Sequence, residues 1–508
     1  MFTSVGILLS LASFLLYAVL IFRIRSRKGS VLPPGPLGLP IIGNFFDMPR
    51  KRPWEVYAKL AKNYESHLLS MELPGVTLII LNDVRTATDL LTKRAAKYSD
   101  RPGFSLLNEI NSFRMFVLQR YGEQWKNDRK MFKNCFESET FSARRTHGFN
   151  AVRRLVTRLL VTHGKDHEQE LGLAVGEFIL LVTYGILPDG KDDPSIKFPG
   201  ELITTLSIIQ RQSLIVDAFP FLKFLPSWFP GTVNQYHIER GIDLLDKIGG
   251  ETTIVPSVCS RYLSLISDRG DAEDQLDDIK NVLGTAYMAG MDTVLGILEN
   301  FVVGMLLYPS VQTKAQYILD SALGDRLPEL SDYGTIPYID ALLDEVVRWM
   351  PVVPMGLPHA LIEDDIYGGY TLPKKAICIA NIWAMLQDEE TFGPNTNNLS
   401  PERFLDVNGH LLANKGDSVD VIFGFGRRSC PGKTMAQEFL WMAIASILTA
   451  CEICEGKDED GLPLVGDRPE SGPDDGLLVM PPRVKCKIKP RKAMDTEIVQ
   501  ESASMGYY

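Results

Sequence analysis

Two stretches of the chain carry hydrophobic patterns that predict long helices. The first runs from Ile279 to Leu307, where apolar residues dominate every turn, and this pattern is typical of a helix buried on all sides. The second runs from Thr434 to Leu448, and its apolar residues recur with the three- and four-residue spacing of one helix face. Those apolar positions are Ala436, Phe439, Leu440, Ala443, Ile444, Ile447 and Leu448. We therefore expect two helices, the first of them deeply buried.

The N-terminus has a different pattern, because residues 1–22 carry no charged side chain and the run from Val5 to Phe22 is dominated by apolar residues. At about 1.5 Å per residue, about 20 helical residues match the roughly 30 Å hydrocarbon core of a bilayer. The basic residues follow this run and do not precede it: Arg23, Arg25, Arg27 and Lys28. A cleaved signal peptide has the opposite order, and basic residues mark the cytosolic side. We predict a single transmembrane signal anchor over residues 1–24.

Residues 25–44 join this basic stop-transfer cluster to a proline-rich segment, Leu32–Gly43. Proline fixes φ and lacks an N–H group, so the segment cannot be a helix or a central strand. We expect a stiff hinge between the anchor and the folded part of the chain. At the other end, residues 491–508 are polar without apolar periodicity, which predicts a disordered tail.

Composition then limits the class of protein. The chain has 508 residues, of which 45% are hydrophobic and 23% charged, as in globular proteins with a large core. The net charge of −10 argues against a nucleic-acid partner. The seven cysteines are an odd number spread over the chain, which favours reduced thiols over a disulfide framework. Cys451 and Cys454 form one isolated pair, which is weak support for a zinc site.

Candidate chemistry concentrates between Phe423 and Gly432, where a glycine-rich loop carries Cys430 directly before the second predicted helix. Pro431 suits the first helical position, because its φ is fixed near the helical value and its missing N–H would have no partner there. We therefore predict that Cys430 caps the helix. Unpaired N–H groups and the positive end of the helix dipole then favour its thiolate. Such a thiolate is either a metal ligand or a nucleophile.

The spacing Phe-x-x-Gly-x-Arg-x-Cys-x-Gly resembles the haem-ligand loop of the cytochromes P450. The resemblance implies that Cys430 is the axial thiolate of a haem iron, a ligand that favours cleavage of the O–O bond. It also implies that Phe423 shields the sulfur and that Arg428 donates to a haem propionate with a fork that lysine cannot match. A buried structural cysteine is the alternative for this loop taken alone.

The pentapeptide Ala289–Thr293 lies inside the first predicted helix and resembles the family's oxygen-binding motif. A glycine inside a helix costs about 1 kcal/mol relative to alanine, and Gly290 would justify this cost by letting a flat ligand approach the backbone. The Thr293 hydroxyl can donate to the carbonyl four residues earlier. The resemblance implies that Thr293 steadies iron-bound dioxygen and that Asp292 belongs to the proton route. Polar groups in a seam between helices are the alternative.

Glu345 and Arg348 stand one helical turn apart in a largely apolar segment, which predicts that they share a partly buried helix face. Further along, Pro401–Phe404 reads Pro-Glu-Arg-Phe and resembles the family motif whose arginine completes a Glu–Arg–Arg network. The resemblance implies that Glu345, Arg348 and Arg403 are structural and take no part in redox chemistry.

Trp125 and Arg129, at i and i+4, resemble the family's helical donors to the haem propionates, and His359 resembles a further donor. Three lysines extend this basic face: Lys126, Lys130 and Lys133. On a chain of net charge −10, a local basic patch suits the acidic flavin domain of a reductase. We expect NADPH–cytochrome P450 reductase as electron donor, with cytochrome b5 as a candidate second donor.

The resemblance runs from residue 32 to residue 490 and points to fungal microsomal enzymes. Three positions depart from the family pattern, where Leu399 replaces a phenylalanine, Lys375 a turn glycine and Glu389 a proline. None of them belongs to the predicted iron, oxygen or propionate sites. They therefore bear on local turns and packing.

Taken as a whole, the resemblance implies the cytochrome P450 fold, mainly α with small β-sheets (α+β), preceded by one N-terminal transmembrane helix. Residues 45–490 would form the haem-binding monooxygenase domain. The implied cofactor is haem b, and NADPH acts indirectly through the reductase. The implied reaction inserts one atom of O2 into a lipophilic small molecule, by hydroxylation or epoxidation. The expected location is the cytosolic face of the endoplasmic reticulum membrane, in fungal secondary metabolism.

The same resemblance implies the pocket walls, whose residues are rich in Leu, Ile, Val, Phe and Met and so indicate an apolar substrate of moderate size. These walls are residues 103–119, 207–224, 287–293, 352–357 and 476–480. The identity of the substrate stays open. Two alternatives for the function remain, a reductase-independent isomerase or dehydratase that acts on peroxides, and a haem-binding sensor or carrier without turnover. The intact Asp–Thr pair and the predicted anchor argue against the first.

Overall fold

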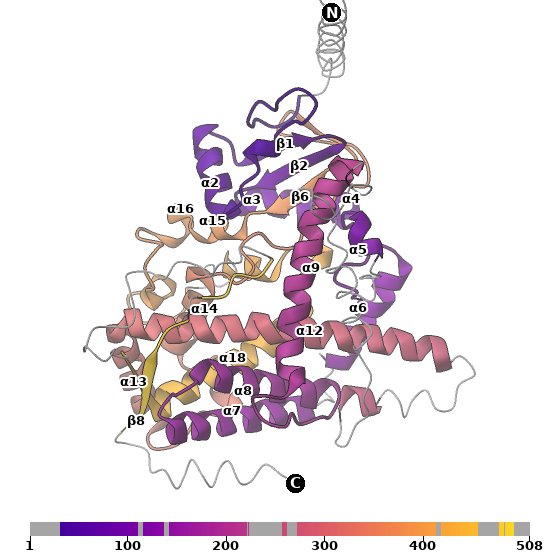
Figure 1. Ribbon diagram of the computed structural model, residues 1–508. Helices are drawn as coiled ribbons and strands as arrows, with labels where there is room; N and C mark the ends of the chain where they lie inside the picture. The colour runs from indigo at the N-terminus through magenta and orange to yellow at the C-terminus, as the bar shows by residue number, and fades with distance from the viewer. Residues whose placement is uncertain are drawn as a thin grey trace, which may run out of the picture.

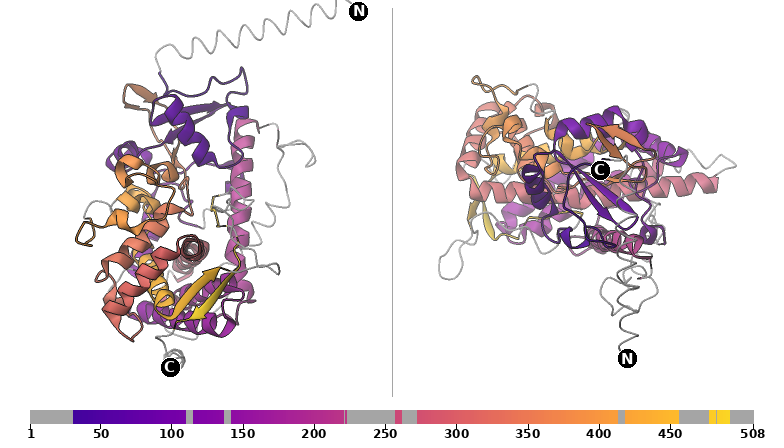
Figure 2. Two further views of the ribbon diagram at one scale, coloured as in Figure 1. Left: turned by 90° about the vertical axis from the view of Figure 1, so that its left-hand side faces the viewer. Right: turned by 90° about the horizontal axis from the view of Figure 1, so that it is seen from above.

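The computed structural model describes residues 31–109, 115–136, 142–220, 222, 257–261, 272–412, 418–455, 477–481 and 483–491. Its longest described helix is α12 (Ala272–Leu307), which crosses the whole molecule in Figure 1. The left view of Figure 2 looks along α12 and shows other elements on several sides of it. The prediction of a long buried helix over Ile279–Leu307 is confirmed.

Several helices pack against α12. Almost every residue of α8 (His167–Thr183) is buried, and so is α18 (Lys433–Ala450) after its first turn, as expected for helices that are hydrophobic on several faces. The helix α9 (Pro194–Ala218) crosses α12 in Figure 1, and α6 (Glu123–Phe136) contacts it as well. The second helix predicted from the sequence, Thr434–Leu448, is α18.

The other helices surround this centre, and they include several short helical turns. They are α2 (Pro53–Asn63), α3 (Val84–Ala87), α4 (Ala95–Tyr98), α5 (Ser105–Glu109), α7 (Ser142–Thr162), α13 (Pro309–Leu323), α14 (Pro337–Trp349), α15 (Ile382–Leu386) and α16 (Glu389–Phe392). The 3-10 turns are η1 (Phe45–Asp47), η5 (Leu330–Asp332), η6 (Pro401–Phe404), η7 (Asp420–Phe423) and η8 (Gly426–Arg428), and η2 (Thr88–Lys93) is a π-helix.

Three small sheets complete the fold. The largest has the order β1 (Leu68–Leu73), β2 (Val76–Leu81), β6 (Ile377–Ala380) and β3 (His359–Ala360), and its β2–β6 pair is parallel. The hairpin of β4 (Asp365–Tyr367) and β5 (Tyr370–Leu372) and the pair of β7 (Cys451–Glu455) and β8 (Cys486–Pro490) are antiparallel. The β2–β6 pair brings residues near position 80 beside residues near position 378, which places His359 close to the N-terminal part of the chain.

The proline-rich segment lies along β1. The Ser70 N–H donates to the carbonyl of Pro34 at 2.9 Å, and its hydroxyl donates to the carbonyl of Pro33 at 2.5 Å. A Cβ on Gly35 would lie 2.0 Å from the Ser70 carbonyl oxygen, so the close approach requires glycine here. The segment forms no helix or strand element, as predicted, and it is fastened to the folded domain by main-chain hydrogen bonds.

Among the described residues, one helix is long and apolar enough to cross a membrane, the stretch Asp278–Leu307 with a mean hydropathy of 1.5. It coincides with α12 and is 61% buried inside the protein, as a core helix would be. The predicted anchor over residues 1–24 and the tail from residue 492 lie outside the described residues. Arg491 donates to the carbonyls of Leu448 and Thr449 at the end of α18, so the ordered domain extends one residue into the predicted tail.

The three departures from the family pattern have local explanations. Lys375 adopts a φ of 68°, a left-handed conformation that costs a residue with a Cβ about 1–2 kcal/mol. Glu389 opens the short helix α16 after the cap Asp388, a position where proline fits and where a negative charge is favoured by the helix dipole. Leu399 is buried, and its Cδ1 lies 3.0 Å from the position of a Cβ on Gly304 of α12.

Candidate active site

The cysteine loop does not have the cap geometry predicted from the sequence. Helix α18 begins at Lys433 and its N-cap is Gly432, so the predictions that Cys430 caps the helix and that Pro431 opens it are wrong. The first i→i−4 hydrogen bond of the helix runs from the Ala436 N–H to the Gly432 carbonyl at 2.9 Å, while the Cys430 N–H donates to the Phe423 carbonyl at 2.6 Å. This bond closes the loop on itself, and Pro431 and Gly432 form a turn before the helix starts.

Two glycines make this loop possible. Gly424 and Gly426 have φ values of 78° and 53°, which residues with a Cβ adopt at a cost. A Cβ on Gly426 would also lie 2.3 Å from the Leu91 carbonyl oxygen of η2. The loop is therefore pressed against the N-terminal half of the chain at a point where only glycine fits.

The Cys430 thiol combines two properties. Cys430 is accessible to solvent, yet many protein atoms surround its sulfur. This burial raises the pKa of the thiol, and the Gly432 N–H and Arg129 lower it by smaller amounts. The Gly432 N–H favours the thiolate, as expected at a helix start, but the effect of burial is larger and favours the thiol. An accessible thiol enclosed by the protein suits a metal ion that replaces the proton and covers the sulfur.

Arg428 lies behind the loop and is buried. Its Nε donates to the Ser99 carbonyl at 2.7 Å, its Nη2 donates to the Gln119 carbonyl at 2.8 Å, and its guanidinium carbon lies 4.3 Å from the centre of the Trp125 ring. The remaining nitrogen, Nη1, is buried without a hydrogen-bond partner. Burial lowers the pKa of Arg428 to about 10, so the side chain is still a cation at neutral pH.

Helix α6 supplies Trp125 and Arg129 from one face, as predicted. Trp125 is buried against Arg428, and the Arg129 guanidinium carbon lies 5.7 Å from the centre of the Trp125 ring. The Arg129 Nη2 also donates to the Ser429 hydroxyl at 3.3 Å, directly beside Cys430. The structure therefore brings Trp125, Arg129 and Arg428 together at the cysteine loop.

His359 joins this group from strand β3, and Arg101 joins it without having been predicted. The His359 Nδ1 lies 2.8 Å from the Tyr98 carbonyl, while burial, Arg101 and Arg428 lower the pKa of His359 to about 3. Arg101 is buried, and its Nη1 donates to the carbonyls of Leu357 and Pro358 at 3.0 and 2.7 Å. These partners are main-chain carbonyls, which every residue carries, so no sequence signal could have identified Arg101.

These residues fit a haem. Arg101 and Arg428 lie close enough to His359 that both of their positive charges lower its pKa. The carboxylate of Asp100 favours the charged form of both arginines. Its oxygens, however, already accept hydrogen bonds from the Arg120 side chain and the Tyr121 N–H. A buried cationic group with an orphaned Nη1 suits an incoming carboxylate, because an unpaired buried donor is costly. The propionates of a haem are such carboxylates, and the neighbouring Cys430 thiol suits its iron.

The middle of α12 carries the predicted oxygen-side motif. The Thr293 hydroxyl donates to the Ala289 carbonyl at 2.7 Å, which confirms the predicted i−4 bond. Ala289 is exposed even though most of the helix around it is buried. A Cβ on Gly290 would lie 2.8 Å from the Ile179 Cδ1 of α8. A larger residue here would therefore have to displace the end of the Ile179 side chain, and the part of Gly290 in cofactor binding stays a prediction.

Asp292 lies on the side of α12 that faces α9. A Cβ on Gly200 of α9 would lie 3.4 Å from the Asp292 Oδ2. Burial raises the pKa of Asp292 to about 6. At neutral pH a fraction of this carboxyl group therefore keeps its proton, which suits a group that passes protons.

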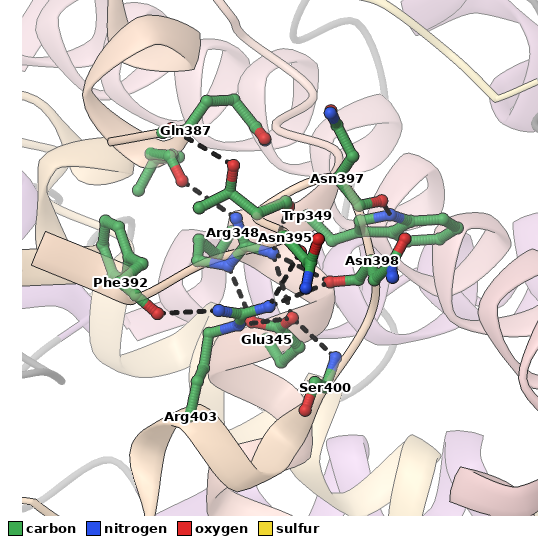
Figure 3. Close-up of polar contacts among 12 residues, drawn as sticks. Glu345, Arg348, Trp349, Gln387, Phe392, Asn395, Asn397, Asn398, Ser400 and Arg403 are labelled. Carbon is green, nitrogen blue, oxygen red and sulfur yellow. Dashed lines mark hydrogen bonds and ion pairs between the residues drawn. The ribbon is translucent and has the colours of Figure 1, made fainter. Parts of the chain in front are cut away.

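The predicted Glu–Arg–Arg network is present and buried (Figure 3). The Arg348 Nε and Nη2 donate to the two oxygens of Glu345 at 2.7 and 2.9 Å, and the Arg403 Nε donates to Oε1 at 2.9 Å. The Ser400 N–H donates to the same oxygen at 2.7 Å. Glu345 and Arg348 are 0% exposed. Arg348 also donates to the carbonyls of Leu386 and Thr396, so the network fastens the segment before the cysteine loop to α14.

The predicted docking lysines are exposed along α6. Lys126, Lys130 and Lys133 all lie at the surface, and Lys126 pairs with Glu123 at 2.6 Å. Arg427 adds a further exposed cation, and its Nη1 donates to the Tyr121 hydroxyl at 2.6 Å. This positive surface follows the side of the domain that carries the cysteine loop.

A small cavity lies between the loop after Tyr98, helix α9 and the segment before β3. Its lining is mostly apolar: five of the lining residues belong to three of the predicted pocket walls, and the other three lie directly beside those walls. The lining residues are Arg101, Pro102, Phe104, Leu107, Leu118, Gln210, Leu357 and Pro358. The parts of the predicted walls at residues 110–114, 221, 223–224 and 476 lie outside the described residues.

The comparisons with known proteins agree with this geometry. The family model described as cytochrome P450 matches residues 33–469. The chain is 36% identical to the cytochrome P450 monooxygenase eriA of Hericium erinaceus, covering 93% of this chain and 91% of that one. It is 34% identical to the cytochrome P450 monooxygenase ple1 of Rhodocybe pseudopiperita, covering 94% and 92%. It is 33% identical to the cytochrome P450 monooxygenase 105 of Postia placenta, covering 94% and 93%. The chain therefore belongs to the cytochrome P450 family and is a haem-thiolate monooxygenase.

Proposed function

We propose that this enzyme is a membrane-anchored monooxygenase of fungal secondary metabolism that oxidises a lipophilic small molecule. It hydroxylates a C–H bond or epoxidises a C=C bond, with electrons from NADPH that arrive through cytochrome P450 reductase. The observation that carries the proposal is the accessible Cys430 thiol beside a buried guanidinium, Arg428, that has one unpaired nitrogen. The two features together suit an iron ligand and a propionate partner of the same haem.

In this proposal the Cys430 sulfur would bind the haem iron, and Phe423 would limit the access of water to that sulfur. Arg428, Trp125 and Arg129 would hold the propionates from the side of α6, while His359 and Arg101 would hold them from the side of β3. When bound, the haem supplies the activation of dioxygen and the transfer of one oxygen atom to the substrate. The protein supplies the ligand, the orientation of the substrate and the exclusion of water.

Thr293 and Asp292 move protons in this scheme. Thr293 donates to the Ala289 carbonyl at 2.7 Å, so its oxygen is free to accept a hydrogen bond from a water molecule or another donor. Asp292 is partly protonated near neutral pH, because burial raises its pKa to about 6. The carboxyl group therefore delivers protons toward the Thr293 hydroxyl and takes up new ones between turnovers.

The substrate, the redox partner and the location are argued from separate features. The apolar lining residues around Phe104, Leu107 and Leu357 favour a lipophilic substrate. The exposed lysines of α6 provide a positive surface for an acidic electron-transfer partner. The apolar run of residues 1–22 followed by basic residues supports a single-pass anchor in the endoplasmic reticulum membrane, with the catalytic domain in the cytosol.

The proposal can be tested by turnover of a lipophilic compound. The compound is chosen from a small library because its binding shifts the absorption spectrum of the haem. We expect product formation to require NADPH and reductase, and we expect the Thr293→Ala variant to consume NADPH while it releases more peroxide and less product. Conversion of a lipid peroxide without NADPH and reductase would instead identify an isomerase or dehydratase. Normal coupling in the Thr293→Ala variant would contradict the role of that hydroxyl.

A further inference from the structure

The short loop before α6 supplies main-chain acceptors to two buried arginines of the candidate site. The Val117 carbonyl accepts from the Arg101 Nε at 3.0 Å, and the Gln119 carbonyl accepts from the Arg428 Nη2 at 2.8 Å. Arg101 follows α4, whereas Arg428 ends η8 much later in the chain. The position of residues 117–119 therefore affects how both guanidinium groups are directed.

A buried carboxyl group of α6, Asp128, holds this loop. The Gln119 Nε2 donates to the Asp128 Oδ2 at 2.7 Å. The Gln124 Nε2 donates to the other oxygen, Oδ1, at 3.0 Å and to the Asp278 Oδ1 of α12 at 2.6 Å. A chain of hydrogen bonds thus runs from α12 through Asp128 to Gln119, whose carbonyl accepts from Arg428.

The burial of Asp128 calls for a reason. The residue is 0% exposed, and its two oxygens accept from glutamine amides and, within the described part of the chain, from no lysine or arginine. Burial raises the pKa of Asp128 to about 6, although the two amides lower it. An apolar side chain at this position would avoid the cost of burying a carboxyl group. The hydrogen bonds that Asp128 accepts, and the loop that one of them holds, supply the reason.

Arg428 shows what the position of the loop controls. Its Nε and Nη2 donate to the carbonyls of Ser99 and Gln119, and its buried Nη1 has no partner among the residues that the structure describes. Because a guanidinium group is planar, two fixed nitrogens determine where the third one points. A shift of the Gln119 carbonyl would free Nη2 and change the direction of Nη1.

We propose that Asp128 is a positioning residue for the haem, which holds residues 117–119 through the Gln119 amide and thereby directs the Arg428 Nη1 toward a propionate. The inference rests on the proposed assignment of Arg428 to a propionate, to which it adds the residue that fixes the direction of the guanidinium group. Asp128 itself contacts neither the haem nor the substrate, and no covalent bond changes.

The test compares Asp128→Leu and Asp128→Asn with the wild-type holoenzyme. The rate of haem transfer to apomyoglobin and the propionate bending band of the resonance Raman spectrum are measured. We expect Asp128→Leu to speed transfer severalfold and to shift the band. Asp128→Asn should have smaller effects of the same sign, because its amide can donate to the Gln119 Oε1, which is buried without a partner in the described structure. If the leucine variant does not fold, the asparagine variant carries the test alone.

The matched control is Glu123→Gln, which removes one negative charge from the exposed side of the same helix and should keep wild-type values. If Asp128→Leu lowers the melting temperature of the apoprotein but changes neither haem measurement, Asp128 supports the fold alone and the proposal is wrong. If Arg428→Lys speeds haem transfer and Asp128→Leu does not, the positioning role is wrong and the propionate assignment stands. If neither variant changes transfer or the band, the propionate assignment itself is wrong.

Discussion

Replacement of Glu345 by alanine is expected to destabilise the protein by removing the common partner of two buried arginines. Arg348 is 0% exposed, and it would keep only main-chain acceptors such as the carbonyls of Leu386 and Thr396. Removal of one partner from a buried ion pair costs about 3–5 kcal/mol, because the other charge stays buried without compensation. If the domain of roughly 450 residues unfolds as one unit, this corresponds to a fall in the melting temperature of about 3–5 °C.

Differential scanning calorimetry of the purified holoenzyme at one pH and one scan rate measures this fall. The matched control is Glu123→Ala, which removes the surface partner of Lys126. These two side chains lie 2.6 Å apart and are 80% and 47% exposed, so the control should lose little stability. A Glu345→Ala protein that melts within a degree of the wild type, or no lower than the control, would refute the assigned structural role.

Three further changes test other parts of the structure. Cys430→Ala should abolish the red-shifted absorption band of the reduced, carbon monoxide-bound haem, while Cys454→Ala on β7 should leave it in place. Arg428→Lys should speed haem transfer to apomyoglobin by about tenfold or more, because one charge-assisted hydrogen bond contributes about 1.5–3 kcal/mol; an unchanged transfer rate would count against a propionate at that position. Burial and then Asp340 raise the pKa of Asp344 to about 7. Between pH 4 and 7 the folded state thus holds a proton that the unfolded chain has lost, and stability falls as pH rises. Asp344→Asn should therefore match the wild type at pH 4 and melt higher at pH 8, and equal melting at pH 8 would contradict the shift.

Motif spacing predicted the residues of the site better than their local geometry. Trp125, Arg129 and Arg428 lie together as the motifs imply. Their contacts are between side chains, and the identities of those side chains can be read from the sequence. The start of α18 could not be predicted in the same way. It depends on which carbonyl accepts the first i→i−4 bond, and in the structure this is the Gly432 carbonyl, which accepts from the Ala436 N–H.

Arg101 shows the same limit for a buried cation. It donates hydrogen bonds to the carbonyls of Val117, Leu357 and Pro358. Because every residue has a main-chain carbonyl, the residue types at these positions do not reveal the contacts. The surroundings of Asp292 were equally hidden, because Gly200 of α9 approaches its carboxyl group only after the chain has folded. Helix periodicity identified α12 as a core helix, and the fold alone determines which of its polar groups face one another.

The residues proposed to bind the propionates also indicate when the site becomes complete during synthesis. The bond of Arg428 to the Ser99 carbonyl spans 329 residues, and the contact of His359 with the Tyr98 carbonyl spans 261. Both His359 and Arg428 belong to the last third of the chain, so neither contact forms until most of the polypeptide has left the ribosome. Haem uptake is therefore a late step of biogenesis, and a cell that is short of haem should accumulate a nearly finished apoprotein.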